Sequence, residues 1–150
     1  MRIISGMAGG IQLVAPRGNN TRPTTDRVRE SLFATLGNLT DLVVLDLYAG
    51  TGALGLEALS RGAKHCTFVE SERGALPQLQ RNIQSVLRQW AENDPKKPTT
   101  ELLKTTVERA LPRILRTSQI PDIIFADPPY RDKSGNPTAT RLLKNSDIPE

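Results

Sequence analysis

The stretch VVLDLYAGTGALGLEALS, residues 43–60, decides the fold. Its apolar start, residues 43–45, predicts a buried strand, and residues 53–60 predict a helix that ends before Gly62. Between them, glycines lie at the carboxyl end of the strand, where the backbone of α/β proteins passes close to a ligand. Neither Gly-Lys-Ser nor Gly-Lys-Thr follows, so the loop is not a P-loop. The stretch therefore predicts a βα unit with a ligand-binding loop.

Apolar runs alternate with amphipathic segments along the rest of the chain, which is typical of βα units around a parallel sheet. Residues 2–4 and 11–15 predict a β-hairpin ahead of the sheet, and residues 91–100 predict a surface loop. The remaining expected elements are strands at 67–69, 101–104 and 123–126 and helices at 26–36, 74–90, 107–116 and 138–144. The fold class is therefore α/β, with a mostly parallel sheet and an N-terminal hairpin.

Length and composition limit the class of protein. A chain of 150 residues, 37% hydrophobic and 24% charged, has the size and composition of one folded domain. A single cysteine, Cys66, and a single histidine, His65, exclude an internal disulfide and a structural zinc site, and we expect no metal. No apolar run approaches the roughly 20 residues that cross a bilayer. We therefore expect an untargeted protein of the cytoplasm that does not enter a membrane.

Positive charge gathers at the N-terminus. The net charge is +4, and most of the 20 basic residues are arginines, which bind phosphate through two hydrogen bonds. Within residues 1–29 the single acidic residue is Asp26. Either a solvated helix face or a polyanion surface fits this pattern, and the density of arginine favours nucleic acid. The candidate RNA-binding residues are Arg2, Arg17, Arg22, Arg27 and Arg29.

An acidic residue ends the second predicted strand. Glu70 follows Asp46 at the spacing at which a carboxylate binds both hydroxyls of an adenosine ribose. A glutamate at a strand end is by itself most often a solvated terminus. Together with Gly50 and Gly52, however, Glu70 favours a nucleoside cofactor.

The last predicted strand ends in the box Asp127-Pro128-Pro129-Tyr130. Two prolines hold the backbone extended and offer no N–H, so the Asp127 carboxylate and the Pro128 carbonyl are acceptors aimed at the cleft. Such acceptors suit an exocyclic amine, because hydrogen bonds from its N–H groups localise its lone pair for attack on a methyl group of S-adenosylmethionine. We expect Tyr130 to stack on the base.

These motifs resemble one known family. MRIISG at residues 1–6, TRPTTDRVRESLF at 21–33, LDLYAGTGALGLEALSRGA at 45–63 and the box at 127–130 resemble the RsmD family. That family uses S-adenosylmethionine to methylate guanine N2 in bacterial 16S ribosomal RNA. The resemblance implies a Rossmann-like class I methyltransferase fold in a single domain, with residues 1–20 as a hairpin arm and 21–150 as the catalytic core. It also implies about three further strands, so the core is expected to be incomplete at its C-terminus.

The resemblance assigns roles to matching residues. Asp127, Pro128, Pro129 and Tyr130 would receive the guanine, and the arginines named above would meet RNA. The residues implied for the cofactor, which leaves as S-adenosylhomocysteine, are Asp46, Tyr48, Gly50, Gly52, Glu70, Thr24 and Asp26. The implied partner is ribosomal RNA or an assembling small subunit, and the protein is expected to be a monomer.

Thr106 departs from the family pattern, since relatives usually carry an acidic residue there, near the adenine. Two alternatives stay open. The same box could serve amino groups of DNA or a protein amide, although residues 22–29 argue against both. The chain could also be an RNA-binding fragment that has lost cofactor binding and catalysis.

Overall fold

The computed structural model describes residues 1–17 and 25–129, and it confirms an α/β fold around a four-stranded parallel sheet of order β3-β2-β1-β4. The strands are β1 (Val43–Leu47), β2 (His65–Val69), β3 (Thr99–Leu103) and β4 (Ile123–Ala126). The helices are α1 (Asp26–Leu36), α2 (Ala53–Ser60), α3 (Leu76–Leu87) and α4 (Val107–Leu115). Among the described residues, no helix is long and apolar enough to cross a membrane.

Three predicted elements, α1, α2 and β4, have the bounds expected from the sequence. The first three strands each include residues that were not expected, and β1 continues through Asp46 and Leu47. The third helix is shorter than predicted, because Pro77 occupies its first turn and the chain leaves the helix at Arg88. The predicted helix at residues 138–144 lies outside the described residues.

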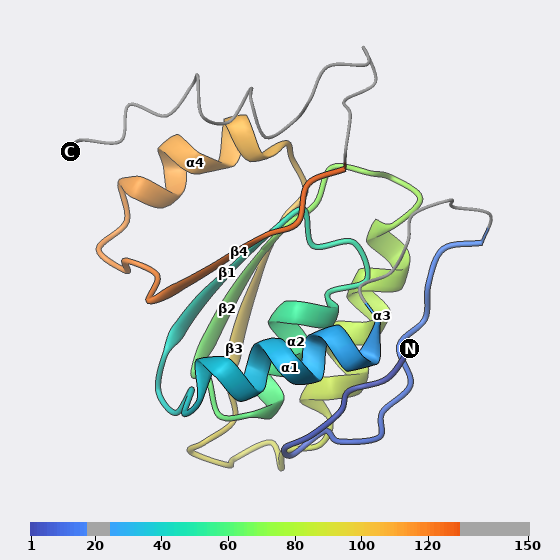
Figure 1. The fold of residues 1–150 in the computed structure, drawn as a ribbon. Coiled ribbons are helices and arrows are strands. Elements are labelled where there is room, and N and C mark those ends of the chain that lie inside the picture. The colour runs from blue at the N-terminus through green and yellow to red at the C-terminus, as the bar shows by residue number, and fades with distance from the viewer. Residues whose placement is uncertain (18–24, 130–150) are drawn as a thin grey trace.

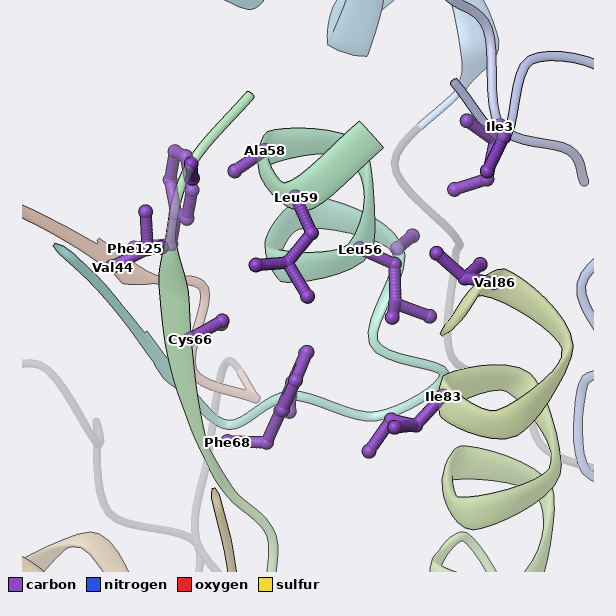
Figure 2. Close-up of a cluster of buried hydrophobic side chains, with 14 of the residues drawn as sticks. Ile3, Val44, Leu56, Ala58, Leu59, Cys66, Phe68, Ile83, Val86 and Phe125 are labelled. Atoms are coloured by element: carbon purple, nitrogen blue, oxygen red, sulfur yellow. The ribbon is translucent and has the colours of Figure 1, made fainter. Parts of the chain in front are cut away.

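Helices cover both faces of the sheet. Helices α1, α2 and α3 lie on one face and α4 on the other (Figure 1). Because side chains alternate along a strand, Val44 of β1 faces the first group while Leu45 and Leu47 pack with α4. Figure 2 shows the larger core, where Phe68 and Phe125 of the sheet meet side chains of α2 and α3. Burying each such large apolar side chain contributes about 1.5–3 kcal/mol.

The N-terminal arm, residues 1–17, turns back and pairs antiparallel with itself, as the predicted hairpin requires. A bridge joins Arg2 to Gln12, the Ile3 N–H donates to the Ile11 carbonyl at 2.9 Å, and the Leu13 N–H donates to the Met1 carbonyl at 3.0 Å. The pairing is too short to form regular strands, and side chains of α2, Glu57 and Ser60, bind other parts of the arm's backbone. Gly6 permits this approach: its φ is +87°, and a Cβ there would lie 1.9 Å from the Ser60 carbonyl oxygen.

A buried charge cluster fastens the arm to the helices. Arg29 of α1 is fully buried, with Nη1 3.5 Å from Glu57 Oε2 and Nη2 donating to the Arg2 carbonyl at 2.7 Å and to Asp26. The Glu57 carboxylate also accepts from Arg61 Nε at 2.8 Å. The prediction that Arg29 binds RNA is therefore wrong, because its guanidinium is inside the protein. It neutralises a carboxylate that has no access to water.

This cluster generates a stability prediction. In Arg29→Met, Glu57 loses its fully buried counter-charge and keeps only Arg61, and Asp26 loses a partner. We expect the free energy of unfolding to fall by up to about 3–5 kcal/mol, because removal of one partner leaves the buried carboxylate only partly compensated. The matched control is Arg27→Met on the exposed side of the same helix, which should change it by no more than about 0.5 kcal/mol. Urea denaturation at neutral pH measures both, and equal losses in the two variants would contradict the structural role of Arg29.

Candidate functional site

The carboxyl ends of the strands bring the predicted site residues to one edge of the sheet. All four strands are parallel, so the loop after β1, Glu70 after β2 and Asp127 after β4 lie at the same edge, the upper one in Figure 1. The register places β1 between β2 and β4, with Asp46 paired to both Phe68 and Phe125. The glycine loop, residues 48–52, is therefore flanked by a carboxylate on each side.

The glycine loop has an unusual backbone. Tyr48, Gly50 and Gly52 all have positive φ, at 58°, 57° and 80°. Tyr48 is the one residue of these three that is not glycine. A residue with a side chain adopts this conformation at an energetic cost that surrounding contacts must offset. A Cβ on Gly52 would lie 2.6 Å from Leu79 Cδ1, so the loop packs closely on α3. These constraints keep the backbone of the loop close to the end of β1.

Glu70 joins the loop to the end of β2. Its Oε2 accepts from the Gly50 N–H at 2.7 Å, and its Oε1 accepts from the Glu72 N–H at 2.7 Å. Each carboxylate oxygen has a second lone pair, so Glu70 retains acceptor capacity for a hydroxyl of a ligand. The structure thus brings Glu70 and the glycine loop into direct contact, in a fixed orientation.

Asp46 lies in a different place from the one predicted. It is inside β1 and only 2% exposed, and its Oδ2 accepts from the Gly55 N–H at 2.9 Å. The contact satisfies a free N–H in the first turn of α2, whose N-cap residue, Gly52, offers no side chain for this purpose. The buried carboxylate therefore holds the start of the helix, and its contact with a cofactor stays a prediction.

The site is electrostatically negative. The pKa of Asp46 rises from 3.8 to about 7, mainly because the carboxyl group is buried; the hydrogen bond from Gly55 lowers this pKa, and the carboxylates of Glu70 and Asp127 raise it. Asp127 is exposed and follows β4, where the chain leaves the sheet. Carboxylates this close together favour a ligand with positive charge.

The remaining predicted residues fall into four groups. Arg2, Arg17 and Arg27 are exposed, as a surface that meets RNA requires. Asp26 pairs with Arg29 and lies 3.9 Å from Arg2 Nε, so its observed contacts are with the charge cluster of the arm. Pro128 and Pro129 follow Asp127 with partial and full exposure. Thr24, Arg22 and Tyr130 lie outside the described residues, and their roles stay predictions.

The sequence reasoning missed three residues that build the site. Gly55 completes a G-x-G-x-x-G spacing with Gly50 and Gly52, and a Cβ there would lie 2.5 Å from Phe68 Cε1. Glu57 is a lone charge in an apolar helix, and Asn82 is a polar residue beside the apolar positions of α3. A polar side chain on a buried face was the available signal for both. In the described part of the chain, no group of three His, Cys, Asp or Glu residues is placed to hold a metal ion.

A family model, named relatives and a solved structure all match most of this chain. The family described as conserved hypothetical protein 95 matches residues 1–149. A Bacillus subtilis protein named "Putative rRNA methyltransferase YlbH" is 39% identical over 89% of this chain, and the Escherichia coli protein named "Ribosomal RNA small subunit methyltransferase D" is 36% identical over 87%. The chain spans 68% and 61% of their lengths. A solved structure, "Putative methyltransferase yhhF from Escherichia coli", is 38% identical with a TM-score of 0.68, over 89% of this chain and 66% of that one.

The raised pKa of Asp46 generates a pH prediction. With a pKa of about 7 in the folded chain against 3.8 unfolded, the folded state binds more protons between these values. Stability therefore falls as pH rises from about 4 to about 7, by at most about 1.4 kcal/mol per pH unit from this group. The Asp46→Asn variant lacks this titration but keeps an oxygen for Gly55, so the difference in free energy of unfolding between wild type and variant should decline over this range and then level off. A constant difference from pH 4 to pH 8 in urea denaturation would show that Asp46 is not perturbed.

Proposed function

Because this chain belongs to the family described as conserved hypothetical protein 95, the RsmD family that its motifs resemble, we propose that it is an S-adenosylmethionine-dependent methyltransferase acting on small-subunit ribosomal RNA. The acceptor we propose is the exocyclic N2 amine of a guanine. One observation carries the proposal: the glycine loop lies between the carboxylates of Glu70 and Asp127, at the open edge of a parallel sheet.

Charge at the site supports this cofactor over a dinucleotide. A pyrophosphate beside Glu70 and Asp127 would meet like charge, whereas a sulfonium and an ammonium group are cations. When bound, S-adenosylmethionine supplies an electrophilic methyl group. The Glu70 carboxylate accepts hydrogen bonds from the ribose hydroxyls, and its bond to Gly50 holds the loop against the cofactor. Asp46 and Gly55 hold the start of α2, which keeps the loop in position.

The acceptor amine is oriented by the box after β4. Asp127 is exposed at the edge of the sheet, so a base can reach its carboxylate, and the two prolines that follow have no N–H, so the box offers acceptors only. Both oxygens accept from the amine N–H groups and localise its lone pair. Held in this way, the amine would take the methyl group from the sulfonium of bound S-adenosylmethionine, whose S–C electron pair would stay on sulfur, and the amine proton would leave to solvent.

RNA reaches the site along the arm. Arg2, Arg17 and Arg27 are exposed, and each can bind a phosphate without reading sequence. The substrate is ribosomal RNA, free or in an assembling small subunit, and its location puts the reaction in the cytoplasm. The names of the relatives support an rRNA substrate.

Calorimetric titration with S-adenosylmethionine tests the cofactor pocket. We expect saturable binding by the wild type, and binding weakened about 10–100-fold in Glu70→Gln, because a charged acceptor for the ribose is lost. Glu101→Gln is the matched control, since that carboxylate pairs with Arg113 instead. A folded wild type that does not bind would contradict the proposal and favour the inactive RNA-binding fragment.

Methyl transfer to a transcript of small-subunit ribosomal RNA tests the box. Asp127→Asn should lower kcat by about 10²–10³-fold, because a charged acceptor used in the transition state is lost. Cofactor affinity should fall far less, by about tenfold at most, since Asp127 acts on the amine and contributes only one of the charges that attract the sulfonium. Wild-type turnover in this variant would show that Asp127 does not activate the amine.

A further inference from the structure

Asn82 of α3 joins two segments of the site that are far apart in sequence. Its side chain is buried, with 1% of the residue exposed. The amide Nδ2 donates to the carbonyl of Val14 in the arm and to the carbonyl of Thr51 in the glycine loop, at 2.9 Å each. The amide Oδ1 accepts from the Val14 N–H at 2.8 Å. One side chain therefore binds the main chain of both the arm and the loop.

An amide is the chemistry that this position requires. Asn82 pairs with both the N–H and the C=O of Val14, as a neighbouring strand would, and uses its second N–H on Thr51. Reversing the amide would turn its oxygen toward two carbonyls and lose every bond. An aspartate at this position would keep an acceptor for the Val14 N–H but would have no donor for either carbonyl.

The arm's other anchors do not reach the loop backbone. Glu57 accepts from the Ile4 and Ser5 N–H groups, and Ser60 Oγ accepts from the Ala8 N–H at 2.9 Å. These contacts tie the first part of the arm to α2. A weak contact, from Thr51 Oγ1 to the Met1 sulfur at 3.7 Å, adds to the link between arm and loop.

We propose that Asn82 is a positioning residue that couples the cofactor loop to the RNA-facing arm. The inference rests on the proposed function, because it assigns the loop to the cofactor and the arm to RNA. A ligand that fixes the loop also fixes the Thr51 carbonyl, which orients the Asn82 amide and holds Val14, and Arg17 follows Val14 in the chain. Cofactor binding therefore raises RNA affinity, and RNA raises cofactor affinity by the same factor, since coupling between two sites is reciprocal.

Affinity for a small-subunit ribosomal RNA transcript, measured with and without saturating S-adenosylhomocysteine, tests the coupling. We expect the ligand to raise RNA affinity about tenfold in the wild type, within the usual range of coupling between sites. In Asn82→Asp the factor should fall to about one. The matched control is Ser60→Ala, which removes an arm anchor that does not touch the loop: it should lower RNA affinity but keep the wild-type factor.

Amide hydrogen exchange gives a second readout that needs no RNA. S-adenosylhomocysteine should slow exchange at residues 8–17, and in Asn82→Asp this protection should be lost while the loop stays protected. If Asn82→Asp does not fold, slowed exchange in the wild-type arm supports the coupling, and unchanged exchange overturns it.

The outcomes separate the inference from the proposed function. Saturable S-adenosylhomocysteine binding with no effect on RNA affinity or on arm exchange would overturn the coupling and leave the methyltransferase intact. Wild-type coupling in Asn82→Asp would overturn the role of Asn82. No binding of S-adenosylhomocysteine by the folded wild type would overturn both.

Discussion

The hydrogen bond between the Gly55 N–H and the Asp46 carboxylate sets the geometry on which the site depends. It joins the middle of β1 to the first turn of α2, so both ends of the glycine loop are fixed. The approach is close enough that a Cβ on Gly55 would lie 3.0 Å from Asp46 Oδ2. With its ends fixed and the loop short, the backbone adopts the left-handed conformations at Tyr48, Gly50 and Gly52. The strained loop therefore follows from the contact between strand and helix.

Burying Asp46 has an electrostatic cost, which explains why its pKa rises to about 7. The N-terminus of α2 offsets part of this cost, because it presents N–H groups and a partial positive charge to the carboxylate. Glu70 and Asp127 add like charge from the neighbouring strands. The three carboxylates make different contacts. Asp46 binds the start of α2, Glu70 binds the glycine loop, and Asp127 is exposed at the edge of the sheet. A cationic ligand would relieve the repulsion among them.

The sequence was sufficient to predict what depends on short-range pattern. Alternation of apolar runs and helical segments predicted the parallel sheet, and the glycines with Glu70 predicted the edge where they meet. The pattern could not show that Asp46 is inside β1, because an aspartate just before a glycine loop fits the loop as well as the end of the strand. It also could not show that Arg29 pairs with Glu57, since α1 and α2 are distant in sequence and an arginine in a helix rich in charged residues is typical of a solvated face. The antiparallel pairing of the arm was predictable from its sequence, but its anchors Glu57 and Asn82 were not, because they come from helices distant in sequence.

Polar anchors give the arm a defined position that apolar contacts alone would not. Ile3 and Leu13 bury the arm against the core, but apolar packing tolerates sliding and repacking at little cost. A buried N–H or carbonyl that loses its partner is far more costly, so Glu57, Ser60 and Asn82 allow one register of the arm on α2 and α3. Helix α2 begins at the glycine loop, and α3 packs on it through Leu79. The arm, the loop and the sheet edge are consequently held by the same two helices, so any displacement of the loop strains the hydrogen bonds that hold the arm.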